Sequence, residues 1–226
     1  MSRGRGGRRL LAAAVAALAM LAGCQDNMWW EYRDDPYMAN IAEKGEQEVV
    51  RGINSQSKEQ RMTALRVAAS RAGEYRLQGD TGTARDLEEI IIRRYFVERE
   101  QEVRACIVQM CAPSVGRSGT MVRFLRERIA AGEFPGYAAI SLASLGPRSA
   151  FEDIEPLTRH PAPDVRLQAA TALTILADPR GYDSVLKVWK GMESTLWPDR
   201  MEGVSRREAR RGLEARALRA FGKPLQ

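Results

Sequence analysis

A cysteine, an arginine and an aspartate in this sequence have the types and spacing for phosphate chemistry. Cys111 precedes Arg117 within CIVQMCAPSVGRSGT (106–120), with five residues between them, and Asp199 ends the triplet WPD. A thiolate can attack phosphorus while an arginine and the amides of a helix N-terminus hold the phosphate oxygens. A carboxylic acid can protonate the leaving group. These residues predict a nucleophile at Cys111, supported by Arg117 and Asp199.

The letters VGRSGT (115–120) resemble the phosphate loop of cysteine-dependent phosphatases, and WPD resembles the loop that carries their general acid. The sequence departs from that family in four ways. Met110 replaces the histidine that lowers the pKa of the cysteine, and Ser114 replaces a glycine of the loop. Asp199 follows the cysteine instead of preceding it, and no strand is evident to deliver the thiol. The phosphatase is therefore kept as the alternative function.

Few other side chains could support catalysis. His160 is the only histidine, which argues against acid–base or triad chemistry. Cys106 and Cys111 lie five positions apart on a predicted helix, which is too far for a disulfide bond. Without a nearby histidine they do not make a metal site either. The sequence predicts no metal, no cofactor and no small-molecule substrate.

The elements that would position these residues are helices that recur at a step of 31 residues. In residues 160–189, small and aliphatic residues form one stripe of a helix at Val165, Ala169, Leu173 and Leu176. The unit at 133–159 repeats this pattern with Ala138, Ala139, Leu142 and Leu145. No long run of alternating residues calls for a sheet, and EEIIIRRYFVE (88–98) is flanked by helix formers. The predicted fold class is all-α.

Local signals mark where these helices begin and end. Ser or Thr followed three positions later by Asp, Glu or Gln predicts helix starts at Ser57, Thr83, Ser149 and Ser205. Glycines predict helix ends at Gly73, Gly132, Gly146 and Gly222. The stretch 72–82 is expected to be a long joint, and residues 191–203 an insertion without regular structure.

The unit HPAPDVRLQAATALTILADPR (160–180) resembles short bacterial HEAT-type repeats. The match is close over 160–190, fair over 134–159 and partial over 101–132 and 204–224. The resemblance implies a HEAT-like α-solenoid of about four to five helix pairs, with a surface for a protein partner. In this frame Cys111 stands 31 positions before Leu142, so it is interpreted as a core residue, and APSVGRSGT as the turn before a helix that starts at Ser118 or Thr120.

The N-terminal residues predict export and lipidation. Arginines precede an apolar run, 10–22, that is too short to cross a bilayer and ends in LAGC at Cys24. LAGC resembles the lipobox of bacterial lipoproteins, in which the cysteine carries a lipid and becomes the new N-terminus. Residues 1–23 are therefore expected to be removed. The loss of four arginines lowers the net charge from +6 to +2, so the basic composition does not indicate nucleic acid.

Three surface features are candidate contacts for a partner or a membrane. Trp29 and Trp30 could rest at the membrane interface or cap the first repeat, of which capping is preferred. Trp197 lies in the insertion, and Arg206 and Arg210 belong to a basic face of the last helix that either binds an anionic surface or faces water.

The sequence as a whole predicts a signal peptide over 1–23, an aromatic tether or cap over 24–56 and a repeat domain over 57–226. The expected function is that of a non-enzymatic scaffold, held at a membrane of the bacterial envelope by the lipid on Cys24. It would face the periplasm and bind an envelope protein.

Overall fold

The computed structural model describes residues 35–111, 114–115, 117–146, 149–194, 197–201 and 204–226. These residues contain 11 α-helices and a single two-stranded ribbon, so the predicted all-α class is confirmed. The chain divides into two compact units, residues 1–47 and residues 48–226. The predicted start of the repeat domain at residue 57 thus lies inside the second unit.

The described part of the first unit is mainly helix α3 (Pro36–Glu43). The Asp35 carboxylate caps this helix by accepting hydrogen bonds from the backbone N–H groups of Tyr37 (3.0 Å) and Met38 (3.4 Å). Pro36 occupies the first helical position, where a missing N–H costs nothing. Helix α4 (Gln47–Ile53) belongs almost entirely to the second unit.

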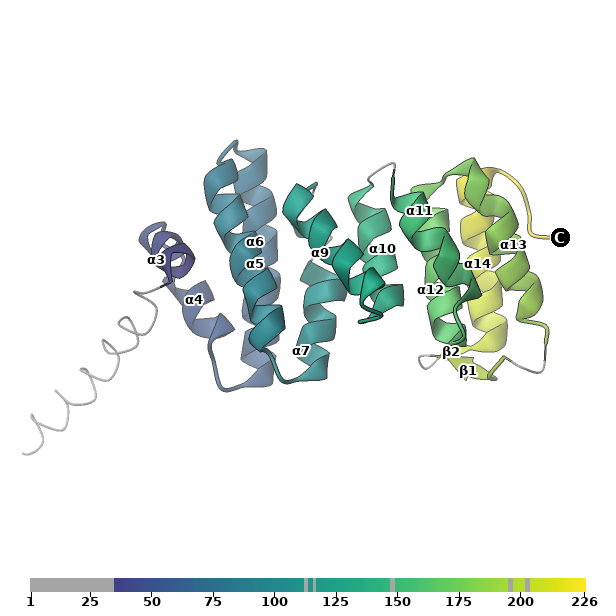
Figure 1. Cartoon of the computed structure of the whole chain (residues 1–226), viewed down its shortest axis with the longest axis horizontal. Helices are drawn as coiled ribbons and strands as arrows, with labels where there is room; N and C mark the ends of the chain where they lie inside the picture. Colours follow the sequence, from purple (N-terminus) through teal and green to yellow (C-terminus); the bar gives the residue numbers. More distant parts are fainter. Residues whose placement is uncertain (1–34, 112–113, 116, 147–148, 195–196, 202–203) are drawn as a thin grey trace, which may run out of the picture. The chain divides into compact units, whose positions relative to one another are not determined.

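The helices of the second unit, labelled in Figure 1, alternate along the chain between two sets, a first row and a second row. The first row consists of α5 (Lys58–Leu77), α7 (Gln101–Cys106) with the π-helical turn η1 (Ile107–Cys111), α10 (Pro135–Leu145), α12 (Pro163–Leu176) and α14 (Arg206–Phe221). The second row consists of α6 (Thr81–Val97), α9 (Gly119–Ala130), α11 (Ala150–Ile154) with the 3₁₀ turn η2 (Glu155–Arg159), and α13 (Tyr182–Gly191). A further 3₁₀ turn, η3 (Pro179–Gly181), leads into α13.

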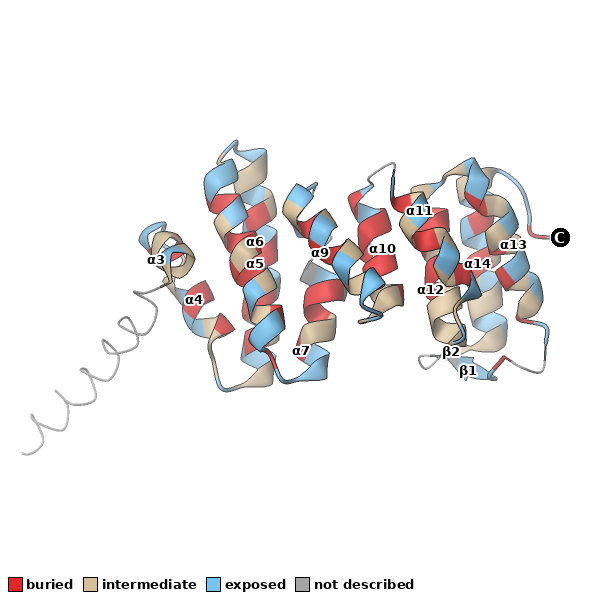
Figure 2. Ribbon diagram, viewed as in Figure 1, coloured by how far each residue is buried: buried red, intermediate tan, exposed pale blue. Residues whose placement is uncertain are grey.

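Successive helices of the first row contact one another. Helix α5 contacts η1, η1 contacts α10, α10 contacts α12, and α12 contacts α14. In the second row, α6 packs on α5 and α9, while α13 packs on α12 and α14. Buried residues gather where neighbouring helices meet, and exposed residues cover their outer sides (Figure 2).

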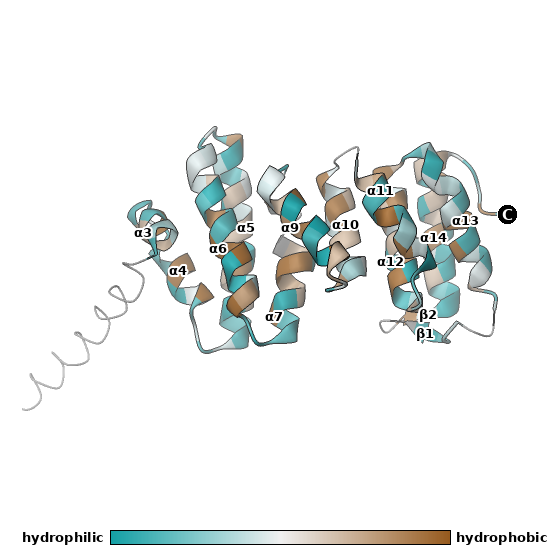
Figure 3. Cartoon of the chain, viewed as in Figure 1, coloured by the Kyte–Doolittle hydropathy of each residue, from teal (hydrophilic) through white to brown (hydrophobic). Residues whose placement is uncertain are grey.

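The core is built from the small and aliphatic residues that the repeat predicts. Ala138, Ala139, Leu142, Ala169 and Leu173 are all fully buried. Hydrophobic residues concentrate on the adjoining parts of α7, α10 and α11 (Figure 3). Small side chains let α10 and α12 approach closely, and this pair has the most extensive contact in the unit.

Several predicted helix boundaries are confirmed. Ser57 and Ser205 are N-caps, and Ser205 forms a full capping box with Glu208. Ser118 is the N-cap of α9, as the turn interpretation of the cysteine stretch requires. Helices α10 and α14 end at Gly146 and Gly222, and α9 ends just before Gly132.

Other boundaries were predicted wrongly. Gly73 does not end a helix, because α5 continues to Leu77, so the joint to α6 is short. The backbone of Ser114 instead approaches α5 closely at Gly73. A Cβ atom at residue 73 would lie 2.6 Å from the Ser114 carbonyl oxygen. Helix α6 is capped by Asp80, whose carboxylate accepts from the Thr83 backbone N–H at 3.0 Å, so Thr83 is not the cap.

The segment 191–203, predicted to lack regular structure, contains strand β1 (Arg200–Met201), which pairs antiparallel with β2 (Val204–Ser205). This short ribbon leads directly into α14.

The chain after α14 folds back onto α13. The Tyr182 hydroxyl donates a hydrogen bond to the Pro224 carbonyl at 2.8 Å, and the Tyr182 ring meets that of Phe221 edge to face. Leu225 is buried, with 1% of its surface exposed. Residues 222–225 therefore cover part of the last helix pair.

Candidate functional site

The structure does not place Asp199 beside the segment that contains Cys111. Cys111 is the last residue of η1, which packs on α5, α6, α7 and α10. Asp199 precedes β1, has a side chain that is 94% exposed, and pairs with Arg206 at 3.1 Å. Arg117 is exposed. The side chain of Cys111 lies outside the described part of the chain, so its place in the core stays a prediction.

The start of α9, next to the proposed phosphate loop, contacts a carboxylate of the protein itself, that of Glu88 on α6. The Ser118 hydroxyl donates to the carboxylate of Glu88 and accepts from the Met121 backbone N–H at 3.2 Å. Glu88 is 1% exposed and also pairs with Arg76. A bound phosphate would meet this buried negative charge. The arrangement instead ties α5, α6 and α9 together.

The three residues proposed as contacts near the C-terminus make internal contacts: Trp197 is buried, whereas Arg206 and Arg210 stay partly exposed, so their role as contacts remains a prediction. Trp197 is only 5% exposed, and the guanidinium of Arg166 lies 4.5 Å from its ring centre. Arg206 donates to the carbonyl oxygens of Ser194 (3.0 Å) and Trp197 (3.3 Å). Arg210 stacks on the ring of Trp189 at 3.7 Å and pairs with Glu193. These side chains fasten the described part of the 191–205 segment to α12, α13 and α14.

An aromatic–arginine cluster, which the sequence interpretation missed, lies where α6, α7, α9 and the start of α10 meet. It consists of Tyr95, Phe96, Arg104, Phe124, Arg128, Glu133 and Phe134. The Arg128 guanidinium lies 5.0–5.4 Å from the ring centres of Tyr95, Phe96 and Phe124. The Arg104 guanidinium lies 4.4 Å from that of Tyr95. Such stacking is favourable for a partly desolvated arginine.

One carboxylate in the aromatic–arginine cluster faces both guanidinium groups. Glu133 accepts from the Tyr95 hydroxyl at 2.8 Å and pairs with Arg128 (2.5 Å) and Arg104 (3.2 Å). The hydrogen bond from Tyr95 and the pair with Arg128 lower the pKa of Glu133. Burial and the bond to Glu133 raise the pKa of Tyr95. The cluster therefore has one more positive than negative charge near neutral pH.

The aromatic–arginine cluster is open to solvent on one side. Phe96 is 60% exposed and the adjacent Val97 is 67% exposed, although both are large apolar residues. The backbone of Phe134 is left-handed (φ +50°), a conformation that costs a non-glycine residue about 1–2 kcal/mol. Strain of this kind is found preferentially at functional sites. Exposed aromatic rings beside stacked arginines are typical of the energetic centres of protein interfaces.

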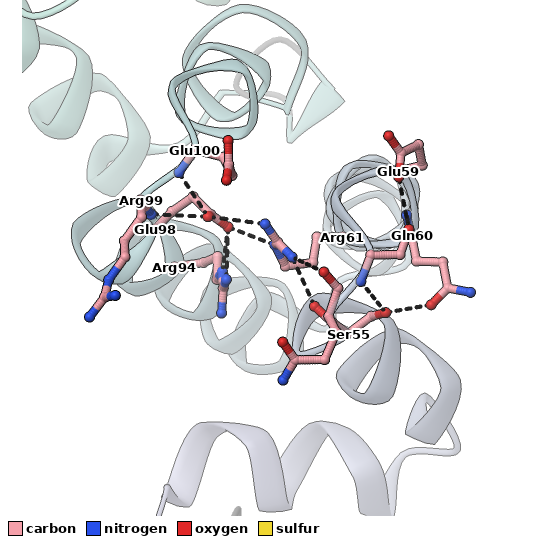
Figure 4. A network of polar contacts seen from close by, with 10 residues as sticks. Ser55, Glu59, Gln60, Arg61, Arg94, Glu98, Arg99 and Glu100 are labelled. Atoms are coloured by element: carbon pink, nitrogen blue, oxygen red, sulfur yellow. Dashed lines mark hydrogen bonds and ion pairs between the residues drawn. The ribbon is translucent and has the colours of Figure 1, made fainter.

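A buried ion-pair network fixes the end of α6, directly after Phe96 and Val97 (Figure 4). The Glu98 carboxylate accepts from Arg61 at 2.8 Å, from Arg94 at 2.7 Å and from the Glu100 backbone N–H at 3.1 Å. Arg61 also donates to the Ser55 carbonyl at 3.0 Å. Burial raises the pKa of Glu98, but the bonds from Arg94, the Glu100 N–H and Arg61 outweigh it and hold the pKa at about 2.

The residues proposed for membrane attachment, Cys24, Trp29 and Trp30, lie outside the described residues. No helix in the described part is long and apolar enough to span a bilayer. Among the described side chains, no three of His, Cys, Asp and Glu come together as a group that could bind a metal ion.

Comparisons with protein-family models, with curated proteins and with solved structures give no match to this chain.

Proposed function

We propose that the protein is a membrane-tethered, non-enzymatic scaffold whose helices form a HEAT-like solenoid and bind a protein partner in the bacterial envelope. The contacts between successive helices of the first row support a solenoid, as does the 31-residue step that places Leu142 and Leu173 at equivalent buried positions. Repeat proteins of this kind present extended surfaces and work by binding. The anchor is the lipid on Cys24, with the chain on the periplasmic side.

The observation that carries the proposal is the exposure of Phe96 and Val97 beside the stacked guanidinium of Arg128. A partner that covers Phe96 would remove an aromatic ring from water, while Glu133, whose side chain is 39% exposed, offers a charged hydrogen-bonding group at its rim. Both ring and guanidinium are held by neighbours, so little conformational entropy is lost on binding. The Glu98 network fixes the helix end that presents them.

Affinity capture from the native envelope tests the partner surface. The lipidated protein, its Phe96→Ala variant and a Leu77→Ala variant would be compared by quantitative mass spectrometry. Leu77 is 90% exposed and near the end of α5, which makes it a matched control. Removing a central aromatic weakens binding by about 30-fold or more, so the partner should be lost only with Phe96→Ala. Equal recovery with all three forms would exclude this surface.

Two further measurements test the anchor and the absence of catalysis. Cys24→Ser should leave the precursor uncleaved and without lipid, and normal processing of this variant would refute the anchor. The purified protein should not hydrolyse an aryl phosphate. Hydrolysis that disappears in Cys111→Ser would instead establish the phosphatase.

A further inference from the structure

The outer face of α14 is basic and contains one exposed aliphatic side chain. Four residues fall on one side of the helix, namely Arg207, Arg211, Leu218 and Arg219. Because an α-helix turns by about 100° per residue, their positions around the helix axis lie within about a third of a turn. All four are exposed, Leu218 by 50%. Arg216, also exposed, lies beside this face.

The arginines of the outer face differ in their partners from Arg206 and Arg210, which face α13 and the segment before α14. Arg206 and Arg210 are occupied by Asp199, Glu193, Trp189 and backbone carbonyls. Within the described residues, Arg207, Arg211 and Arg219 form no ion pair. The nearby Glu208 carboxylate is engaged in the capping box with Ser205. The Glu214 carboxylate, three residues after Arg211, is half-buried on the same side of α14, so the outer face contains more guanidinium groups than carboxylates but is not free of anions.

We propose that this face of α14 binds the anionic headgroups of a phospholipid membrane. The proposal rests on the lipid anchor of the proposed function. The guanidinium groups extend from one side of the helix and can meet a flat anionic surface, where each group can bind a phosphate through two parallel hydrogen bonds. Leu218, among the arginines, can enter the boundary between headgroups and acyl chains.

The composition of the face favours a lipid surface over an acidic protein. It contains only one large apolar side chain, Leu218, and no aromatic ring, whereas the centre of a protein interface is enriched in aromatic residues. Each basic residue near an anionic leaflet strengthens binding by about fivefold. Such binding is weak for a free protein, but an anchor that holds the protein at the membrane gives it a high effective concentration.

Tryptophan quenching by brominated lipids tests the contact. The full-length lipidated protein would be reconstituted in brominated phosphatidylcholine vesicles, with or without phosphatidylglycerol, as the parent form and as Leu218→Trp and Leu77→Trp variants. Leu77→Trp is the control, because Leu77 is exposed on α5. Leu218→Trp should be quenched beyond the parent only with phosphatidylglycerol, and the extra quenching should disappear at high salt.

Charge variants added to Leu218→Trp test the role of the arginines. Changing Arg211 and Arg219 to glutamine should weaken the contact by about 25-fold. The same change at Arg85 and Arg123, which are exposed on α6 and α9 and have no ion pair in the described residues, should have no effect.

Each contrary outcome has a distinct meaning. If the Leu218→Trp variant floats with the vesicles but its fluorescence is quenched no more than that of the parent, the lipid contact is overturned and the anchor stays intact. Equal quenching without phosphatidylglycerol shows an apolar contact and refutes recognition of anionic headgroups. A protein that does not float with any vesicle refutes the anchor and the lipid contact together.

Discussion

Replacing Glu98 with glutamine should destabilise the protein at neutral pH and remove much of its sensitivity to acid. Glu98 accepts hydrogen bonds from Arg61 and Arg94, and its side chain is 2% exposed. Glutamine keeps nearly the same shape but lacks the charge. Arg61, which is 8% exposed, would then be buried without a counter-charge.

The magnitude follows from the pKa of the carboxyl group. The pKa of Glu98 is about 2 in the folded protein, against an ordinary value of 4.5. One pKa unit corresponds to about 1.4 kcal/mol, so the charged form is stabilised by about 3 kcal/mol on folding. Because the folded pKa is the lower one, this stability is fully present above about pH 5. It is lost as the pH falls through 4.5 towards 2.

Urea unfolding followed by circular dichroism at pH values from 7 to 3 measures both effects. Glu98→Gln should lose about 3 kcal/mol at pH 7, and its stability should change less than that of the parent between pH 5 and 3. Glu102→Gln is the control, because Glu102 pairs with Lys58 while 70% exposed. That variant should unfold like the parent. Parallel pH curves for Glu98→Gln and the parent would refute the reasoning.

Three further predictions concern packing and backbone conformation, and each is measured by thermal or urea unfolding. Gly73→Ala should destabilise by about 1–3 kcal/mol, because the new Cβ would clash with the Ser114 carbonyl, whereas Gly212→Ala in the interior of α14 should stabilise by about 0.5–1 kcal/mol. Equal effects at the two glycines would show that the close approach at Gly73 is not real. Ala177→Gly should stabilise by about 0.5–1 kcal/mol, since Ala177 ends α12 with φ +53°, and a loss of stability would contradict this. Trp197→Ala should cost about 3 kcal/mol, as expected for a buried ring, and a neutral result would restore Trp197 as an exposed contact.

The helical class and several helix ends could be predicted because their causes are local. Ser57, Ser118 and Ser205 cap helices through side chains that reach backbone groups three residues away. Gly146 and Gly222 end helices through their own left-handed backbone. Signals of this kind lie within a few residues of one another in the sequence.

The errors have causes that are distant in sequence. Gly73 was predicted to end a helix because glycine is common at that position. In the structure the Ser114 carbonyl, about forty residues later, leaves no room for a side chain at residue 73. Trp197 resembles an exposed loop residue, yet it is buried, and its ring contacts the guanidinium of Arg166 on α12, about thirty residues earlier. No local pattern shows which side of a loop a tryptophan will face.

The aromatic–arginine cluster was missed for the same reason. The cluster residues Tyr95, Arg104, Phe124 and Phe134 are spread over four structural segments. Only the packing of α6, α7, α9 and the start of α10 against one another brings them together. The sequence did contain one signal: Tyr95, Phe96 and Val97 are consecutive, so a helix cannot bury all three. At least one of the three is then exposed, and in the structure Phe96 and Val97 both are.

The return of residues 222–225 onto α13 has a consequence for biogenesis. Tyr182 obtains its hydrogen-bond acceptor from Pro224, about forty residues later, and Leu225 is buried only after that return. The pair α13 and α14 therefore cannot complete its packing until residues 222–225 have been synthesised and have folded back. Synthesis and return of residues 222–225, rather than synthesis of α13 itself, set the moment at which this region matures, and a variant without these residues would leave part of α13 uncovered.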